Sequence, residues 1–369
     1  MSEVANNKIK INVFGDLCLF GVDPNSFKFG DDVKALMHEA VNVGNLECPV
    51  TEATTQKGYK SAHFKVHQES LKLLEDFHVL SLANNHIADY LEEGIQDTIK
   101  HVEEKGFKWF GVGTSHDEAL KPCIIEAGGR KIAFFGASRW ANISKELIIG
   151  TASENISKLK KQIKALKSQG CIVIPYFHWG YEYVRIPAPR ERKIAKVCID
   201  AGADMVIGSH PHIYQGYEIY KGKPIYYSLG NAIFLSERFN NGMAPIKDDP
   251  RLFNAFFLQI TIDGKQQIEV KTIGYQLSDT GLRLLTPEEQ EKQKQELEQV
   301  SVILRKPYIK YWKQYYRQAV SSCDHHIYMK HRFQKIDEKK TKDKIKILMN
   351  FNSQDLRNRL AHLFRFLFK

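Results

Sequence analysis

Two histidines one residue apart stand at the end of an apolar run of this chain. The segment Gly208-Ser209-His210-Pro211-His212 directly follows Met205-Val206-Ile207. Neutral histidine is the commonest metal ligand, and a turn at the end of a strand can aim both rings into one pocket. A lone His-Pro-His is also compatible with an ordinary polar loop. The interpretation therefore depends on the residues at the ends of the other apolar runs.

Carboxylates, amides and imidazoles follow four other apolar runs in the same way. These candidates are Asp16, Asn45, Glu47, Asn85, His86, Asp89 and His178. Ligands of these types suit Mn²⁺, Fe or Zn²⁺, and a carboxylate can bridge two ions. Two ions about 3.5–4 Å apart can drive in-line attack on a phosphoester and stabilise its charged oxygens. Histidine can also act as an acid or a hydrogen-bond donor, which is the role considered for His86.

The elements that must position these residues alternate between strands and helices. Helical stretches are predicted at residues 32–40, 69–77, 94–105, 153–168 and 190–201, between short apolar strands. Tight turns at Gly128-Gly129 and Asp263-Gly264 predict two hairpins, the second of them the final one. The pattern indicates an α/β domain with a partly antiparallel sheet. Because loops after the strands of such a sheet meet in one crevice, the candidates are expected to lie together.

The order of the motifs resembles a known family. G-D, N-L-E, N-N-H-x-x-D, H-W-G-x-E and G-A-D-x-V-I-G-x-H-P-H, followed by Y-S-L-G-N, are similar to those of the CapA family of capsule and poly-γ-glutamate synthesis proteins. That family in turn resembles the calcineurin-like metallophosphoesterases. The resemblance covers residues 9–234. It implies an α/β fold of two mixed β-sheets packed together and flanked by helices.

The resemblance also implies roles for individual residues. It implies one or two divalent ions (Mn, Fe or Zn), and it places His86, with Asp89 nearby, where related enzymes have a histidine that protonates the leaving group or steadies the transferred phosphoryl. Cys18 stands where the superfamily usually has a histidine, and the N-L-E segment replaces its bridging aspartate. Two alternatives stay open: Cys18 is a ligand or a buried thiol, and either Asn45 or Glu47 faces the metal. The implied ligands are Asp16, Asn45 or Glu47, Asn85, His178, His210 and His212.

Basic side chains on nearby loops are candidates for binding an anionic phosphoester or polymer-related substrate. They are Lys57, Lys60, Arg139 and Arg185, and the uncharged Tyr59 is considered together with them. The alternative for each cation is an ordinary solvated surface position. Trp179 is expected to pack against the sheet.

The positive charge of the chain is concentrated at its C-terminal end. Residues 301–369 carry 17 Lys/Arg against 5 Asp/Glu, whereas residues 1–300 carry 36 against 38. We therefore expect a CapA-like metallophosphoesterase domain over residues 1–280 and a basic helical extension over residues 281–369. Residues 356–369 have the pattern of a basic amphipathic helix, which can lie on a membrane surface or dock on the protein or a partner. No recognition motif indicates nucleic acid.

The cysteines and the N-terminal residues bear on the cellular compartment. Six widely spaced cysteines without a C-x-x-C pair favour reduced, mostly buried thiols. The residues before Ile9 lack the pattern of a signal peptide, and no run of 18 apolar residues occurs. The expected location is cytoplasmic, with the inner face of the membrane as a peripheral alternative.

Two functions are compatible with these observations. The first is a metal-dependent phosphoesterase-like hydrolase in the synthesis of a bacterial capsule or surface polymer, poly-γ-glutamate or a polysaccharide. The alternative is a non-catalytic metal-binding or structural subunit of a membrane-associated polymer-synthesis complex. Cys18 and the basic extension favour the alternative.

Overall fold

The computed structural model describes residues 8–58, 62–140, 148–235 and 249–323. The chain divides into two compact units, residues 1–318 and 319–369, and both main sheets lie in the first. The amphipathic segment expected at residues 356–369 lies outside the described residues.

Among the described residues, a first sheet of nine strands contains both the first and the last strand of the chain. Parallel pairing joins β1, β3, β4 and β5, and antiparallel pairing joins β1, β15, β16 and β17, so the sheet is mixed. The strand order is β2 (Lys28–Phe29), β17 (Gly281–Leu284), β16 (Ile268–Ser278), β15 (Asn254–Ile262), β1 (Ile9–Cys18), β3 (Val41–Leu46), β4 (Val79–Ser81) and β5 (Lys108–Phe110), with β14 (Asn231–Phe234) also paired to β1.

A second sheet contains six of the described strands. Parallel pairing joins β13, β11, β10 and β8, and the outer strands β12 and β7 pair antiparallel. The order is β12 (Tyr217–Tyr220), β13 (Lys223–Tyr226), β11 (Val206–Ser209), β10 (Ile172–His178), β8 (Arg130–Phe135) and β7 (Cys123–Ala127). Every residue of β10 is buried, which explains its unbroken apolar sequence. Strands β6 (Val112–Gly113) and β9 (Gly150–Thr151) form a separate ribbon.

The two sheets pack face to face through one apolar core. Ile11 and Val13 of β1 and Leu258 of β15 lie in the same cluster as Ile174 and Tyr176 of β10. A hydrogen bond also crosses this interface, because Tyr176 Oη donates to Phe14 O over 2.7 Å.

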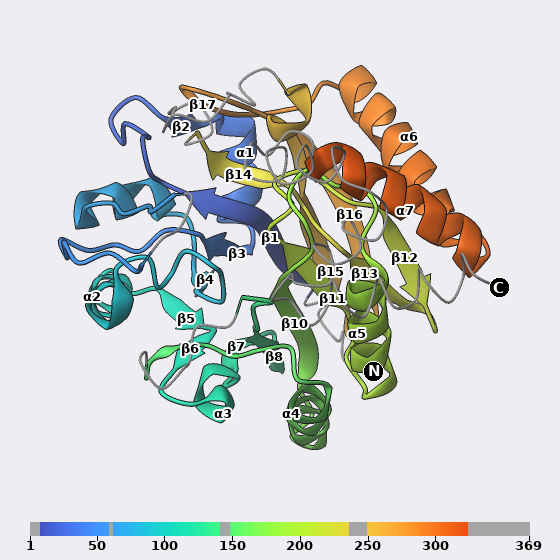
Figure 1. The fold of residues 1–369 in the computed structure, drawn as a ribbon, viewed down its shortest axis with the longest axis horizontal. Helices are drawn as coiled ribbons and strands as arrows, with labels where there is room; N and C mark the ends of the chain where they lie inside the picture. Colours follow the sequence, from blue (N-terminus) through green and yellow to red (C-terminus); the bar gives the residue numbers. More distant parts are fainter. Residues whose placement is uncertain (1–7, 59–61, 141–147, 236–248, 324–369) are drawn as a thin grey trace, which may run out of the picture. The chain divides into compact units, whose positions relative to one another are not determined.

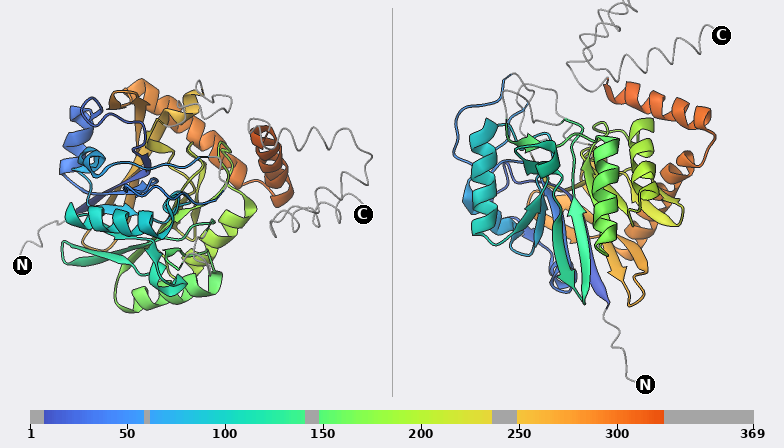
Figure 2. Two further views of the ribbon diagram at one scale, coloured as in Figure 1. Left: turned by 60° about the vertical axis from the view of Figure 1, so that its left-hand side comes forward. Right: turned by 90° about the horizontal axis from the view of Figure 1, so that it is seen from below.

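Helices cover the outer faces of the two sheets (Figure 1), and Figure 2 shows α2 and α4 on opposite sides of the strands. On the first sheet, α1, the 3₁₀ helix η1 and α2 contribute Met37, Leu74 and Ile95 to one core cluster. The predicted architecture of two mixed sheets flanked by helices is confirmed. The helices are α1 (Asp31–His38), η1 (Gln68–Leu74), α2 (Leu91–Glu104), α3 (His116–Ala119), α4 (Ile156–Ser168), α5 (Pro189–Asp200), η3 (Pro250–Leu252), α6 (Pro287–Leu304) and α7 (Tyr308–Cys323).

Residues 223–234 form two strands, β13 and β14, which lie in different sheets, and the chain turns between them through Gly230 at a φ of 84°. Two local predictions differ from the structure. Residues 68–74 form a 3₁₀ helix, where a helix over 69–77 was predicted. The hairpin predicted to be the last is followed by β17, which pairs with β16.

The boundary expected at residue 280 falls in the turn between β16 and β17. Residues 281–318 belong to the first unit. Leu297 of α6 joins the core between the sheets, and Tyr311 of α7 is buried and donates its hydroxyl to Pro187 O over 2.6 Å. Packing of α6 and α7 on the body therefore moves the division of the chain toward its C-terminus.

The cysteines agree with the prediction of reduced, buried thiols. Cys18, Cys48, Cys123, Cys171 and Cys198 are free and buried. Within the part of the chain that the structure describes, no helix combines the length and apolar character needed to cross a bilayer.

Candidate metal centre

Asp16 lies in β1 at a point where two strands from distant parts of the sequence meet. Its backbone N donates to Gly230 O over 3.1 Å, and the register between β1 and its neighbours shifts at this residue. A Cβ on Gly15 would lie 1.9 Å from Gly230 O. The G-D and L-G-N motifs thus have one structural cause, the close approach of these two backbones, and that approach presents a buried carboxylate.

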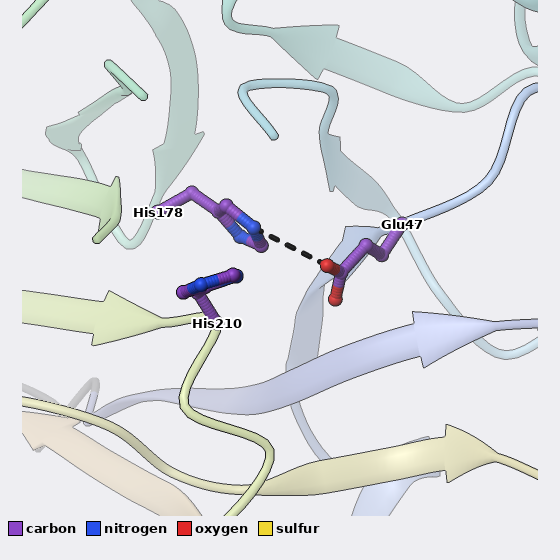
Figure 3. A group of neighbouring side chains, drawn as sticks. All are labelled: Glu47, His178 and His210. Carbon is purple, nitrogen blue, oxygen red and sulfur yellow. Dashed lines mark ion pairs between the residues drawn. The ribbon is translucent and has the colours of Figure 1, made fainter. Parts of the chain in front are cut away.

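Asn45 and Glu47 lie at and just after the end of β3, and their side chains make different contacts. The Asn45 amide donates to Asp16 Oδ1 over 2.8 Å and lies 3.3 Å from His178 Nδ1, while its Oδ1 accepts from Asn84 over 3.3 Å. Glu47 is fully buried, and its Oε1 lies 3.2 Å from His178 Nε2. Figure 3 shows this carboxylate pointing at the His178 ring, with the His210 ring next to it.

His178 is the last residue of β10, and an oxygen atom lies close to each of its two ring nitrogens. Asn85 Oδ1 lies 2.7 Å from Nε2, and Ser209 Oγ lies 3.1 Å from Nδ1. A proton on Nδ1 donated to Ser209 leaves the Nε2 lone pair directed at Asn85 and Glu47. This is the arrangement in which a histidine ligand is oriented by a hydrogen bond from its other nitrogen.

The His-Pro-His loop is held in an unusual backbone conformation. His210 and His212 have φ values of 96° and 59°. Residues other than glycine rarely have a positive φ, and such residues are concentrated at functional sites. Asp16 Oδ2 accepts from the His210 backbone N over 3.0 Å, and His212 Nδ1 lies 3.0 Å from Asn231 Oδ1. The Asp16 carboxylate therefore holds the backbone at His210, and the Asn231 amide contacts the His212 ring.

His86 and Asp89 form a pair at the edge of this cluster. His86 Nδ1 lies 2.7 Å from Asp89 Oδ2, and that oxygen also accepts from the Phe64 backbone N over 2.9 Å. The Phe64 ring packs on the imidazole with 4.4 Å between ring centroids. A buried carboxylate at Nδ1 leaves Nε2 as the nitrogen that can exchange a proton with a bound group.

The structure describes three of the four basic candidates, and each has a different setting. Arg139 reaches Tyr181 Oη at 2.7 Å and Glu191 Oε1 at 3.5 Å, directly after a strand-like bridge to His178. Arg185 contacts Glu296 at 3.4 Å and so interacts with α6. Lys57 is half-buried, and its backbone N donates to Asp89 O over 2.8 Å. Lys60 and Tyr59 lie outside the described residues.

Burial shifts the proton affinities of the central groups. Burial, reinforced by the charge of Glu47, raises the pKa of Asp16 to about 6. Burial and the neighbouring imidazoles His178 and His212 hold the pKa of His210 well below its usual value. His210 is therefore neutral near pH 7, the state in which histidine binds metal.

The arrangement fits divalent metal ions. His210 Nδ1 is buried and has no hydrogen-bond partner among the described residues, while Asp16 and Glu47 place two fully buried carboxylates in one pocket. Buried carboxylates are costly unless they are paired or coordinate a metal. Two groups of donors have ligand atoms within 4.8 Å of one another: Glu47, His178 and His210, and Asp16, Glu47 and His212. Glu47 belongs to both.

Cys18 belongs to none of the donor groups found among the described residues. It packs with the first-sheet core, and burial together with a hydrogen bond to Cys48 raises the pKa of its thiol well above the usual value. The structure therefore favours the buried-thiol alternative. Trp179 is also buried, and its Nε1 donates to Tyr227 O over 2.9 Å, so it packs against the sheet as expected.

Two residues near the cluster were given no role from the sequence. Glu182 lies with His210 and His212 in a third group of donor atoms within 4.8 Å of one another, and the Trp140 ring lies 4.1 Å from the His210 ring. Glu182 is the last residue of the H-W-G-x-E motif, which was the signal available for it.

Comparisons with known proteins show which family the chain resembles. Residues 15–236 match the model of the family described as bacterial capsule synthesis protein PGA_cap. The chain is 36% identical over 203 residues to a capsule biosynthesis protein CapA of Bacillus anthracis, covering 52% of this chain and 49% of that protein. It is 36% identical over 201 residues to the PGA biosynthesis protein CapA of Bacillus subtilis, with 52% of each covered. The chain thus spans about half the length of the curated relatives it matches.

More distant similarities are also present. A probable polyglutamine synthesis accessory protein of Mycobacterium tuberculosis is 29% identical over 223 residues, covering 56% of this chain and 59% of that protein. The solved NAD nucleotidase NadN of Haemophilus influenzae has a TM-score of 0.44 at 13% identity, covering 80% of this chain and 56% of that chain.

Proposed function

The chain belongs to the family of bacterial capsule synthesis proteins, and we propose that it is a metal-dependent phosphoesterase-like hydrolase acting in the synthesis of a capsule or surface polymer. Poly-γ-glutamate and polysaccharide are the two polymer classes considered. The observation that carries the proposal is the convergence of buried carboxylates and imidazoles from both sheets on one pocket. Oxygen and nitrogen donors of this mixture suit Mn²⁺, Fe or Zn²⁺.

Two metal positions share one carboxylate in this proposal. Glu47 belongs to both donor groups, so it would contribute a ligand to each position. Asn85 joins the second position because its Oδ1 lies 2.7 Å from His178 Nε2. The first position is held by Asp16, Glu47 and His212, and the second by Glu47, Asn85, His178 and His210.

Bound ions would supply Lewis-acid activation of a water and neutralisation of phosphoryl oxygens. The protein's own groups would do the rest. Asp89 holds the His86 ring by its Nδ1, so that a proton on Nε2 is available to the leaving oxygen of a phosphoester. Arg139 lies beside the metal ligand His178 and provides a cation for an anionic substrate.

Metal content and hydrolysis test the proposal together. Protein purified without chelator is expected to contain a transition metal and to hydrolyse an aryl phosphodiester or monoester in added Mn²⁺. His210→Ala is expected to lose both, while Glu126→Gln, an exposed change on β7, is expected to retain them. No bound metal and no hydrolysis in the wild-type chain would exclude the proposed enzyme.

A second candidate function is a non-catalytic subunit of a polymer-synthesis complex. The observation that favours it is the burial of Cys18 in the core, which leaves the position of Asp16 and His212 without a ligand from residue 18. Cells carrying His178→Ala or His210→Ala separate the two functions. Polymer production that persists with either variant supports a scaffold, and production that stops at normal protein levels supports the enzyme.

We further propose that the surface of α7 contacts an anionic membrane surface. Lys306, Lys310, Lys313 and Arg317 line a shallow recess of about 370 Å³ and form no ion pair with the described residues. The chain has no Asp or Glu between residues 299 and 323. Tyr308 and Tyr316 expose 64% and 45% of their surface close by. Basic residues near an anionic leaflet contribute about 1 kcal/mol each, and tyrosine favours the headgroup region.

Vesicle binding of the full chain tests this surface. Binding to vesicles containing phosphatidylglycerol is expected to fall on charge reversal at Lys310, Lys313 and Arg317. The matched reversal at Lys160, Lys161 and Lys164 of α4 is expected to leave binding unchanged. Equal binding to neutral vesicles, or a preference for soluble polyglutamate over vesicles, would contradict the proposal.

A further inference from the structure

Glu182 lies beside the histidine pair although it comes four residues after the last residue of β10. Its carboxylate oxygen and the ring nitrogens of His210 and His212 lie within 4.8 Å of one another. His210 belongs to one of the two metal positions proposed above and His212 to the other. Glu182 thus lies close to one ligand of each proposed position.

The loop that carries Glu182 is attached to the His-Pro-His loop on both sides of this residue. Trp179 N donates to Ser209 O over 3.1 Å, and Tyr183 N donates to Pro211 O over 2.9 Å. Gln215 Nε2 donates to Val184 O over 2.7 Å, which anchors the end of the loop. These bonds fix the backbone directly before and after Glu182.

Two residues of the loop that carries Glu182 have positive φ values. Gly180 has a φ of 87°, and Tyr183 has a φ of 63°, which a bulky residue rarely adopts. The Tyr183 ring lies 6.0 Å from the His212 ring. Such a conformation persists where surrounding contacts over-determine it, and it is concentrated at functional sites.

The site has a specific need that Glu182 can meet. The thiol of Cys18 is directed into the core, next to Cys48, and Cys18 takes part in none of the three donor groups found among the described residues. The position defined by Asp16, Glu47 and His212 therefore lacks a ligand from residue 18. The Glu182 carboxylate, close to His212, is a further donor available to this position.

We propose that Glu182 is a metal ligand that completes the position held by Asp16, Glu47 and His212, in place of a side chain at residue 18. This inference rests on the metal centre proposed above. A third carboxylate makes that position rich in oxygen donors. Oxygen ligands favour Mn²⁺ relative to Zn²⁺ more than imidazole does, so the position is expected to take Mn²⁺.

Metal binding by the full chain tests the proposal without relying on activity. The variants are Glu182→Gln, which keeps the size of the side chain, and Cys18→Ala, with Glu126→Gln as the control because Glu126 is 72% exposed on β7. Metal stoichiometry by mass spectrometry and Mn²⁺ affinity by calorimetry are measured for each. Thermal unfolding in chelator checks that the metal-free variants fold equally well.

Glu182→Gln is expected to weaken Mn²⁺ binding by at least about 10-fold and to lower the metal count. Removing a hydrogen-bond partner of a ligand lowers metal affinity by about 10–100-fold, so removing a ligand itself should cost at least the lower end of that range. Cys18→Ala and Glu126→Gln are expected to bind as the wild type does. Cobalt substitution should give no thiolate-to-metal absorption band.

The other outcomes are distinct. Wild-type affinity in Glu182→Gln overturns the role of Glu182 and leaves the proposed function standing. Weakened binding in Cys18→Ala, or a thiolate band, assigns the position to Cys18 instead. A wild-type chain that binds no metal overturns both this inference and the proposed function.

Discussion

The Asn45 side chain donates its amide to Asp16 Oδ1 over 2.8 Å. Its Oδ1 accepts from Asn84, so both ends of the amide are engaged within the protein. Glu47, two residues later, places its carboxylate among the imidazoles and belongs to both proposed metal positions. In the proposed centre, Asn45 therefore orients a ligand, whereas Glu47 would itself be a ligand.

Substitution of these two residues should separate orienting from ligating. Asn45→Leu is expected to lower metal affinity about 10–100-fold, as loss of a ligand's hydrogen-bond partner does. Glu47→Gln is expected to have the larger effect and to reduce metal content at both positions, because it removes the shared carboxylate. Calorimetry and metal analysis measure the difference. A greater loss in Asn45→Leu than in Glu47→Gln would reverse the assignment.

His86 is expected to act on the reaction without holding the metal. His86→Ala should reduce kcat for a phosphoester by about 10²–10⁴-fold, the range for a positioned acid or base. Asp89→Asn should give a smaller loss, because it leaves the imidazole present but changes its preferred tautomer. Metal content should equal that of the wild type in both variants, and a loss of metal in His86→Ala would make it a ligand.

Gly208 has no room for a side chain. A Cβ there would lie 2.2 Å from both Trp179 Nε1 and Tyr227 O, the two atoms of a buried hydrogen bond. Gly208→Ala is expected to destabilise the fold by about 1–3 kcal/mol through overpacking, and to displace the adjacent histidine loop. Urea unfolding measures the change. Gly58→Ala is the control, since no described atom lies within 4 Å of its Cβ position, and equal stability of the two variants would contradict the argument.

Glu154 should make stability depend on pH. Burial, opposed by Arg190 and reinforced by Glu191, raises its pKa from the usual 4.5 to about 7. Between these values the folded state binds more protons than the unfolded state, so stability falls as pH rises and levels off above pH 7. The shift corresponds to a decline of about 3 kcal/mol at most.

Comparison with Glu154→Gln isolates this contribution. The Gln side chain can still accept a hydrogen bond from Arg190, but it does not titrate. Urea unfolding of both proteins from pH 4.5 to 8, in chelator, should show the wild type losing stability relative to the variant across that window. Parallel curves would show that Glu154 titrates alike in both states.

The sequence indicated which residues gather in the candidate site better than it indicated the role of each residue. Polar residues gather near the ends of the apolar runs because parallel strands end at the same edge of a sheet: Asp16 lies two residues before the end of β1, His178 is the last residue of β10, and His210 directly follows β11. The choice between Asn45 and Glu47 depended on side-chain direction after a register shift in β1, which periodicity does not contain. Glu182 is positioned by loop-to-loop hydrogen bonds, and no spacing rule encodes those.

Parts of the fold were hidden for a similar reason. Strands β13 and β14 share one apolar pattern, and the pattern does not say that the chain leaves one sheet for the other between them. The edge strand β12 has an intermediate and exposed outer side, so its signal is weak. Packing of Leu297 and Tyr311 made α6 and α7 part of the body despite their charged and polar composition.

The passage of the chain from β13 to β14 has a consequence for folding. Tyr227 and Gly230 lie between a strand of one sheet and a strand of the other: Tyr227 O accepts from Trp179 beside the second sheet, and Gly230 O accepts from Asp16 in the first. The first sheet cannot be completed before the chain makes this crossing, since β14 pairs with the first strand of the chain. A fragment ending at residue 226 lacks β14, β15 and the Asn231 contact to His212, so it should show a lower urea midpoint and a weaker metal affinity than the full chain.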